Sequence, residues 1–414
     1  MIEESSEKLS VNGKTIEELA ESFDTPLYIY DAEKIQRKIS RIQDEFSKHT
    51  EDFELHYAVK ANNNPKMLEK VNSSGAGFDC ASKWEIKLAL EAGADPDEII
   101  YTCPYNRSEE LEYAVEKGVT VNFDSIGIVE RLEKVPEKVC FRVNPEIEAE
   151  GEFGLKFAGE ESKFGVAEEK IVEAYRKAKD RGGETFGIHM MTGSNVKDPE
   201  YFRKLVEKIF DIAEKISEEV GVEFEFVDIG GGLGIAYRED EETLDLEEAA
   251  KLAGRKFEEL RAEKNIGNPD LVMEPGRFIV GDSGILATQV TEVKESGKKF
   301  VGVDTGMHHL IRPMLYGAYH RVQLAGDLGR KKKENVDVVG PVCESTDVLA
   351  EDRPMPDVEV GEVLAVRDVG AYGFTMASNW NTRPLPAEVL VSAEDVELIR
   401  RRQSFGDVFG NTEM

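Results

Sequence analysis

Residues 54–102 read ELHYAVKANNNPKMLEKVNSSGAGFDCASKWEIKLALEAGADPDEIIYT. Three short apolar, β-branched or aromatic runs occur in this stretch, at Glu54–Val59, Gly77–Cys80 and Ile99–Thr102. The amphipathic segment Lys83–Glu91 separates the last two runs. Strands that alternate with helices form parallel sheets with right-handed crossovers. The stretch therefore predicts an α/β fold.

The same alternation continues to about residue 277. Five further strand candidates follow, at Thr120–Phe123, Val139–Val143, Thr185–Met190, Glu225–Ile229 and Leu271–Met273. Eight strands separated by helices are typical of a (β/α)8, TIM-like barrel. An open doubly wound sheet usually has fewer units and carries GxGxxG after its first strand, and no such motif follows Val59.

The pattern changes after residue 277. Strand-like runs without intervening helices follow, broken by Gly and Pro, at Ile285–Val293, Phe300–Asp304, Val336–Val339, Val363–Val366 and Glu388–Val391. These runs predict an all-β domain, of the sandwich or barrel-like type, at the carboxyl end. Pro26–Tyr30 resembles a strand that completes it. We therefore expect a barrel at residues 36–280 and a β domain made of residues 1–35 together with 281–414.

The charge of the chain is strongly one-sided. Among 414 residues, 52 Lys and Arg stand against 83 Asp and Glu, which gives a formal net charge of −31. Such a field repels phosphate backbones and anionic lipid headgroups, so we expect no nucleic-acid and no membrane-surface partner. A solvated acidic surface that maintains solubility is the simplest explanation of the excess.

The sequence also indicates a cellular compartment. It has no run of 18 apolar residues, and its first residues lack the basic and apolar parts of a signal peptide. Its four cysteines are far apart and form no CxxC motif (Cys80, Cys103, Cys140 and Cys343). We therefore expect a cytoplasmic protein with neither a disulfide framework nor a metal site.

Chemistry in barrel enzymes is located at the carboxyl ends of the strands. The first strand ends in Tyr57-Ala58-Val59-Lys60-Ala61-Asn62, which places a lysine at the barrel mouth. Burial of Lys60 against apolar walls would disfavour its ammonium form and leave an amine able to form a Schiff base. The alternative is an ordinary lysine that extends into solvent.

The other strand ends suggest a single ligand. They supply Asp79, Arg142, His189 and Ser194, the turn Gly230-Gly231-Gly232, and the run Glu274-Pro275-Gly276-Arg277. Glycines after a strand let backbone N–H groups approach an anion such as phosphate. An acid such as Glu274 can keep a pyridine nitrogen protonated. An aldehyde for Lys60, a phosphate for the glycine turn with Ser194 and a basic ring nitrogen for Glu274 together describe pyridoxal phosphate (PLP).

These motifs resemble those of the barrel-type (fold type III) PLP-dependent amino-acid decarboxylases. The resemblance rests on Tyr57–Asn62, Phe78–Ser82, Ser162–Gly165, Gly230–Gly232 and Glu274–Arg277. The later segments Arg312–His320, Cys343–Asp347 and Gly370–Gly373 resemble the diaminopimelate decarboxylases in particular. The motifs follow the order of that family from about residue 25 to residue 400. The resemblance implies decarboxylation of meso-2,6-diaminopimelate to L-lysine and CO2, the last step of lysine biosynthesis.

The resemblance also implies roles for individual residues. Lys60 carries the cofactor, and Cys343 returns a proton to carbon after CO2 has left. The implied cofactor contacts are Lys60, Asp79, Arg142, His189, Ser194, Gly230, Gly231, Gly232, Glu274, Gly276, Arg277 and Tyr372. The implied substrate contacts are Arg277, Arg312, Tyr316, Glu344 and Tyr372, with Arg277 able to serve substrate, phosphate or both. Members of the family are homodimers, so Cys343 and Glu344 would serve the partner subunit's Lys60. A buried Cys343 that acts only as a small hydrophobic residue is the alternative for that position.

One position departs from the family pattern. Where the family usually places a second histidine against the PLP ring, this chain has Met191, whose thioether can contact a ring but can offer no proton. This leaves open a related decarboxylase that acts on ornithine, arginine, a D-configured amino acid or a polyamine precursor. A non-catalytic regulator is disfavoured because Lys60 and Cys343 are both present, and a racemase would need a second base that the motifs do not supply.

Overall fold

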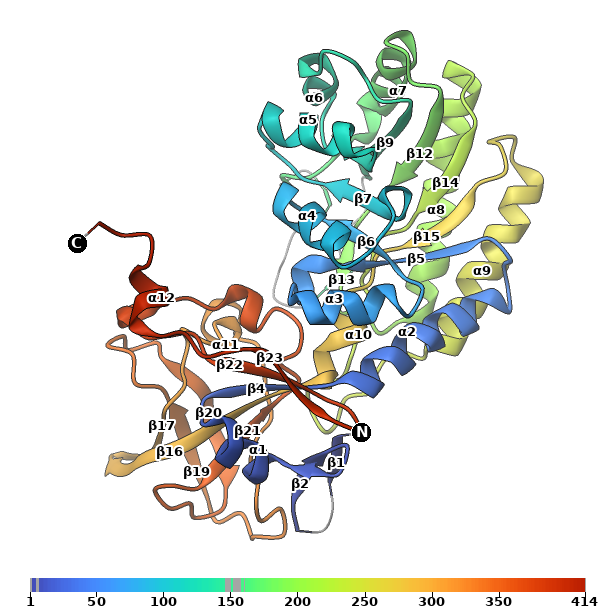
Figure 1. Ribbon diagram of the computed structural model, residues 1–414. Coiled ribbons are helices and arrows are strands. Elements are labelled where there is room, and N and C mark those ends of the chain that lie inside the picture. Colours follow the sequence, from blue (N-terminus) through green and yellow to red (C-terminus); the bar gives the residue numbers. More distant parts are fainter. Residues whose placement is uncertain (1, 5–6, 146–149, 152–157, 160, 414) are drawn as a thin grey trace. The chain divides into compact units, whose positions relative to one another are not determined.

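The computed structural model describes residues 2–4, 7–145, 150–151, 158–159 and 161–413. The chain divides into two compact units (Figure 1). The barrel unit comprises residues 38–235 and 242–278, and the strand-rich unit comprises residues 1–37, 236–241 and 279–414.

Eight parallel strands form the barrel unit's closed sheet. In sheet order they are β5 (Phe53–Ala58), β6 (Gly77–Cys80), β7 (Ile99–Thr102), β8 (Thr120–Phe123), β9 (Lys138–Asn144), β12 (Thr185–His189), β14 (Phe224–Asp228) and β15 (Asp270–Met273). Pairing of β8 with β9 and of β15 with β5 closes the ring, and the short β11 (Val166–Ala167) adds beside β9. The predicted (β/α)8 barrel is confirmed.

Helices precede, connect and follow these strands (Figure 1). They are α2 (Ala32–Ser47), α3 (Pro65–Asn72), α4 (Lys83–Glu91), α5 (Ser108–Lys117), α6 (Ile126–Arg131), α7 (Ile171–Asp180), α8 (Pro199–Val220), α9 (Leu246–Glu263) and α10 (Arg277–Val280). Helix α8 shows why they form: Asp198 caps its first turn, Pro199 occupies a position where no N–H is needed, and Gly221 ends it in the left-handed region. Among the described helices, none is both long and apolar enough to span a bilayer.

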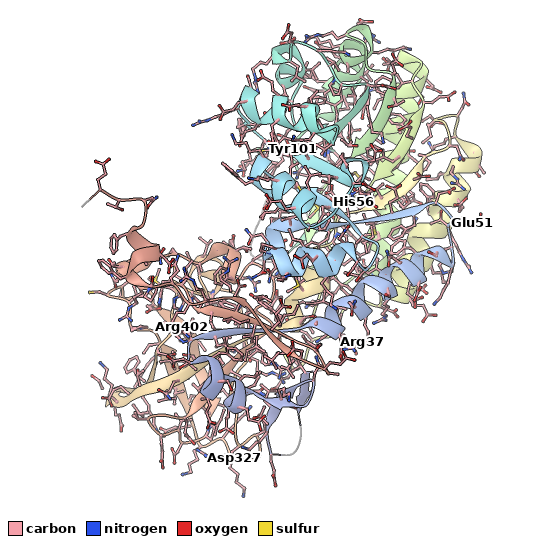
Figure 2. The ribbon with its side chains drawn as sticks, viewed as in Figure 1. Arg37, Glu51, His56, Tyr101, Asp327 and Arg402 are labelled. Carbon is pink, nitrogen blue, oxygen red and sulfur yellow. The ribbon has the colours of Figure 1, made fainter. Side chains whose placement is uncertain are left out.

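Side chains fill the barrel interior. Ile100, Cys140, Phe226 and Val272 come from four different strands and form one buried cluster. The strand β12 has Gly187 beside this cluster, where an added Cβ would lie 2.0 Å from the Phe226 ring. Figure 2 labels His56 on β5 and Tyr101 on β7, which are also buried. The interior is therefore a packed core, and the strand ends remain for chemistry.

The strand-rich unit is built around β4 (Leu27–Asp31), whose five residues are all buried. It pairs antiparallel with β16 (Gly284–Ser296) and parallel with β22 (Ala387–Val391), so the amino-terminal strand completes this sheet as predicted. The other elements are β1 (Ile2–Glu4), β2 (Leu9–Val11), β3 (Lys14–Thr15), α1 (Ile16–Phe23), β17 (Lys298–Val303), α11 (Arg312–Tyr316), β18 (Val322–Leu324), β19 (Glu334–Val339), β20 (Val348–Met355), β21 (Val363–Arg367), β23 (Val396–Arg400) and α12 (Phe405–Phe409). The expectation that no helix interrupts the strands was wrong at α11, which Pro313 in its first turn favours.

Candidate active site

Lys60 and Asp79 meet at the carboxyl ends of neighbouring strands. Lys60 lies in a single turn after β5, and Asp79 lies in β6, where it pairs with Ala58. The Lys60 Nζ donates a hydrogen bond to the buried Asp79 carboxylate, and the Lys60 side chain is 45% exposed. The expected burial of Lys60 is therefore wrong: its ammonium is half in solvent and has an acidic partner. The amine is nevertheless accessible at the barrel end.

Glu274 and His189 form a buried ion pair at the same end of the barrel. His189 ends β12, Glu274 follows β15, and His189 Nε2 donates to Glu274 Oε2 over 3.1 Å. Burial opposes ionisation of Glu274, but the charge of His189 and its hydrogen bond prevail and lower the pKa of Glu274 to about 2. Lys60 contributes in the same direction. The site therefore keeps Glu274 anionic at neutral pH.

A second buried carboxyl lies beside this pair. Asp228 ends β14, and its Oδ1 accepts a hydrogen bond of 2.7 Å from the Gly230 N–H. One side-chain ligand atom each from Asp228, Glu274 and His189 lie within 4.8 Å of one another. Burial, and then the charge of Glu274, raise the pKa of Asp228 well above its usual value. One histidine and two carboxyls could also bind a metal ion, but the hydrogen bond between His189 and Glu274 and the raised pKa of Asp228 favour a proton shared within this group.

The three glycines after β14 are required by their neighbours as well as by any ligand. Gly230 has φ +70°, and an added Cβ would lie 2.7 Å from the Met190 carbonyl oxygen; at Gly231 it would lie 2.5 Å from the Glu274 carbonyl oxygen. The Gly231 N–H donates to Met191 Sδ over 3.3 Å. Met191 thus contacts an N–H group that we predicted to bind the phosphate of PLP.

Two further basic residues belong to this end of the barrel. Arg277 is buried, and its Nη2 donates to Ser194 Oγ over 3.1 Å. Gly276 lets the chain pass closely, because an added Cβ would lie 2.8 Å from Ala61 Cβ. Arg142, at the end of β9, has its guanidinium 4.4 Å from the Phe164 ring centre. The predicted barrel residues are therefore brought together at the carboxyl ends of the strands.

The predicted substrate arginine of the strand-rich unit is firmly held. Arg312 begins α11 and is only 1% exposed. Its Nη1 donates to His320 Nε2 over 2.9 Å, and its guanidinium lies 4.9 Å from the Tyr237 ring centre. His320 Nδ1 in turn donates to the Arg367 carbonyl over 2.9 Å, which fixes the imidazole tautomer. Tyr316 ends the same helix and is half-buried.

The remaining predicted residues also lie in the strand-rich unit. Cys343 is an exposed free thiol, which contradicts the alternative of a buried hydrophobic residue, and its N–H donates to Asn381 Oδ1 over 2.7 Å. Hydrogen bonds from the Thr346 N–H and the Ser345 hydroxyl lower the pKa of Glu344. Tyr372 has φ +57°, a conformation that non-glycine residues seldom adopt and that often occurs at functional sites.

Comparison with known proteins identifies the family. The model of the pyridoxal-dependent decarboxylase, pyridoxal binding domain, matches residues 32–281. A diaminopimelate decarboxylase from Methanothermobacter thermautotrophicus is 43% identical over 97% of this chain and 94% of its own length. The chain belongs to the diaminopimelate decarboxylase family. The crystal structure of a diaminopimelate decarboxylase from M. jannaschii, in complex with L-lysine, has a TM-score of 0.91 at 31% identity and covers 100% of this chain and 98% of its own.

Two acids at the barrel end of this diaminopimelate decarboxylase family member, Asp228 and Asp124, were not predicted as site residues from the sequence. Asp124 follows β8, and its Oδ1 accepts a hydrogen bond of 3.0 Å from the Gly165 N–H. Burial raises the pKa of Asp124. Both acids directly follow or end a buried barrel strand, and that signal was available in the sequence.

Proposed function

We propose that this protein is a PLP-dependent carboxy-lyase that converts meso-2,6-diaminopimelate into L-lysine and CO2. The observation that carries the proposal is the presence of two charge pairs at one end of the barrel, Lys60 with Asp79 and His189 with Glu274. Relatives that match over nearly the full chain are named diaminopimelate decarboxylases. PLP needs two groups from the protein, an amine that reacts with its aldehyde and an anion beside its ring nitrogen.

The residues of the barrel end fit pyridoxal phosphate. Lys60 presents a half-exposed amine for the aldehyde, and Glu274 presents a carboxylate that stays ionised for the pyridine nitrogen. The phosphate would bind to the glycine turn Gly230–Gly232, Ser194 and Arg277, and the Gly231 N–H would exchange Met191 for a phosphate oxygen. When bound, the cofactor supplies an electron sink that allows the carboxyl group to leave the adjacent carbon.

The surrounding residues set the charges that this chemistry needs. His189 keeps Glu274 ionised, so that Glu274 can hold a proton on the ring nitrogen. Asp79 orients the Lys60 amine until the aldehyde replaces that contact. Arg142 lies against Phe164 and adds a positive charge to a group of four acids, Asp79, Asp124, Asp228 and Glu274.

Recognition of the second amino-acid group of diaminopimelate falls to residues of the strand-rich unit. Arg312 is pre-oriented by His320 and Tyr237, so its guanidinium can bind the distal carboxylate with little loss of side-chain entropy. Tyr316 adds a hydroxyl, Tyr372 a second one, and Glu344 a carboxylate for the distal ammonium. Ornithine and arginine have no distal carboxylate and would gain nothing from the pre-oriented Arg312 guanidinium, so diaminopimelate is the better substrate.

We further propose a cytoplasmic homodimer in which active sites are shared between subunits. The shared site is supported by Cys343, an exposed thiol that can deliver its Sγ proton to the carbon that has lost CO2. The reducing compartment is supported by the four cysteines, all of which are free. Mixing inactive Lys60→Ala and Cys343→Ala proteins then restores up to about a quarter of the wild-type activity, because half of all dimers become mixed and each mixed dimer carries one intact site of two. Complete absence of activity after subunit exchange would contradict the shared site.

The substrate assignment is tested by CO2 release from purified protein with added PLP. The test compares meso-diaminopimelate, L-ornithine, L-arginine and D-lysine, each with wild-type protein and with Arg312→Met. We expect release from meso-diaminopimelate alone, and at least a tenfold higher KM in Arg312→Met, because one charge-assisted contact contributes roughly 1.5–3 kcal/mol. Faster release from L-ornithine than from diaminopimelate would overturn the assignment.

A further inference from the structure

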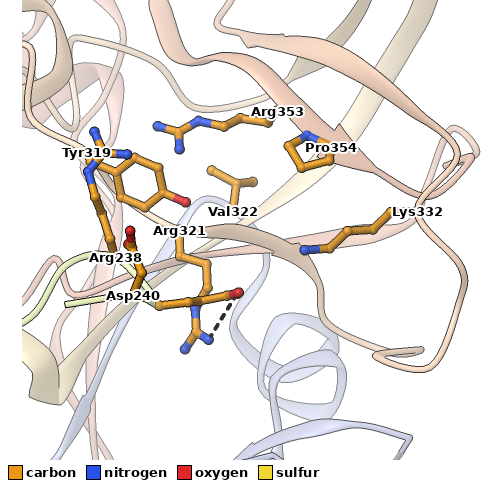
Figure 3. Close-up of a pocket in the computed structure, with 9 residues that line it drawn as sticks. Arg238, Asp240, Tyr319, Arg321, Val322, Lys332, Arg353 and Pro354 are labelled. Carbon is orange, nitrogen blue, oxygen red and sulfur yellow. Dashed lines mark ion pairs between the residues drawn. The ribbon is translucent and has the colours of Figure 1, made fainter. Parts of the chain in front are cut away.

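The strand-rich unit contains a pocket of about 270 Å³ (Figure 3), and none of the proposed substrate residues lines it. Four basic side chains line it, Arg238, Arg321, Lys332 and Arg353, against the acidic Glu239 and Asp240. This excess of positive charge occurs in a chain whose formal net charge is −31. A local excess of positive charge attracts anions, whatever the overall charge of the protein.

Two of these arginines share one aromatic ring. The guanidinium carbon of Arg353 lies 3.6 Å from the Tyr319 ring centre, and that of Arg238 lies 4.2 Å from it (Figure 3). Contact with the ring stabilises each cation but brings the two positive charges close together. Burial, and in addition the charge of Arg238, lower the pKa of Arg353. The two guanidiniums therefore repel each other, and a bound anion would offset that repulsion.

The acids of the pocket do not neutralise Arg353. Glu239 is engaged by Arg321 at 3.6 Å, and Arg238 has Glu241 at 3.9 Å. Arg353 Nε is buried and has no hydrogen-bond partner within the part of the chain that the structure describes. A buried guanidinium N–H without an acceptor is costly, so it marks a place where a ligand oxygen can bind.

The pocket lies next to the residues that hold Arg312. Arg238 follows Tyr237 in the chain and Tyr319 precedes His320, and both Tyr237 and His320 contact Arg312. The Tyr237 and His320 rings also contact each other edge to face, with centres 5.5 Å apart. A ligand that shifts Arg238 and Tyr319 would therefore also shift Tyr237 and His320, the residues that adjoin them in the chain and contact Arg312.

We propose that this pocket binds a small polyanion, a phosphate or polycarboxylate with at least two negative charges, and that its occupancy changes the affinity for diaminopimelate. Planar guanidinium groups bind such oxygen pairs in a forked geometry. Tyr319 already has two guanidiniums over its ring, so recognition is by charge and not by stacking of a nucleobase. Binding itself is independent of the proposed function, whereas the effect on diaminopimelate rests on it through Arg312.

Calorimetric titration of the PLP-loaded enzyme tests binding. Pyrophosphate and citrate are the probes, acetate is the monoanion control, and chloride keeps the ionic strength constant. Loading with PLP removes the cofactor's own phosphate site from the measurement. We expect one site for pyrophosphate, citrate or both, and the probe that binds distinguishes a phosphate ligand from a polycarboxylate. No saturable heat with either probe would overturn the proposal.

Matched variants locate the site. Arg353→Gln should weaken binding by about tenfold or more, since it removes a charge-assisted contact. Lys332→Gln should also weaken binding, whereas Lys331→Gln should not, because Lys331 is the exposed neighbour that does not line the pocket. Arg353→Lys, which keeps the charge, should retain part of the affinity and controls for folding. Equal affinity in the wild type and Arg353→Gln would place the anion elsewhere and overturn the proposal.

Steady-state kinetics test the coupling. A saturating probe should change the KM for meso-diaminopimelate at least twofold in wild-type protein and leave it unchanged in Arg353→Gln. Binding that depends on Arg353 without any change in KM would refute the coupling and leave the binding site established. Absence of decarboxylation with every substrate would refute the proposed function, while the titration would still decide whether the pocket binds a polyanion.

Discussion

Replacement of His189 by leucine tests the electrostatic design of the barrel end. Leucine has a similar volume but donates no hydrogen bond to Glu274, which lies 3.1 Å from His189 in the wild type. Without that partner, burial, which is the largest influence on the pKa of Glu274, favours its protonated form. A neutral Glu274 can no longer hold a protonated ring nitrogen, so the affinity for PLP falls.

The size of the effect follows from the pKa of Glu274. Its value of about 2, against an ordinary 4.5, favours the carboxylate by a factor of roughly 300, which corresponds to about 3 kcal/mol. In the wild type Glu274 is ionised throughout the range from pH 6 to pH 9. In His189→Leu its pKa is raised, so the loss of PLP affinity should be greatest at pH 6 and should shrink as the pH rises and Glu274 ionises.

The assay is a titration of apoprotein with PLP between pH 6 and pH 9, expressed as the ratio of variant to wild-type dissociation constants. Glu274→Gln should show a similar loss without the dependence on pH, and the double variant should lose little more than Glu274→Gln alone. His56→Leu is the matched control, because its partner Glu54 is 55% exposed and can be hydrated without it. A loss in His189→Leu that is constant with pH and additive with Glu274→Gln would show that His189 does not act by keeping Glu274 ionised.

Three further predictions concern single residues of the same barrel end. Lys60→Ala should lose the visible absorbance that PLP gains when joined to a lysine amine, and an unchanged spectrum would exclude Lys60 as the attachment point. Asp228→Asn should keep or slightly increase the denaturant midpoint at pH 7. Burial raises the pKa of Asp228 in the folded wild type, so above pH 3.8 Asp228 ionises more readily in the unfolded chain, which favours unfolding; a clear loss in the variant would contradict this. Met191→Leu should tighten PLP binding severalfold, because the Gly231 N–H then has no sulfur acceptor to give up, and weaker binding would show that the thioether contacts the cofactor.

The barrel could be predicted because its strands have a recognisable sequence pattern. Each is a short buried run bounded by turn or helix signals, and the predicted and observed limits of Gly77–Cys80, Ile99–Thr102 and Thr120–Phe123 are identical. Strand β20 was missed because Glu351, Asp352 and Pro354 interrupt its apolar pattern. An edge strand of this kind has one solvated face, so composition alone does not reveal it.

The sequence predicted which residues lie at this end of the barrel but not how their charges pair. Position at the end of a barrel strand pointed to Lys60, His189 and Glu274, and the family resemblance supported them. Their pairing depends on which strands adjoin and in which register, and no local pattern records that. For the same reason the predicted burial of Lys60 was wrong, and the contact of Met191 with the Gly231 N–H was not predicted.

The stoichiometry of the reaction with meso-diaminopimelate tests the proposed decarboxylation. Purified protein with PLP should release one molecule of CO2 for each molecule of L-lysine formed, and Lys60→Ala should form neither. Consumption of diaminopimelate without L-lysine, or formation of L-lysine by Lys60→Ala at the wild-type rate, would contradict decarboxylation through Lys60.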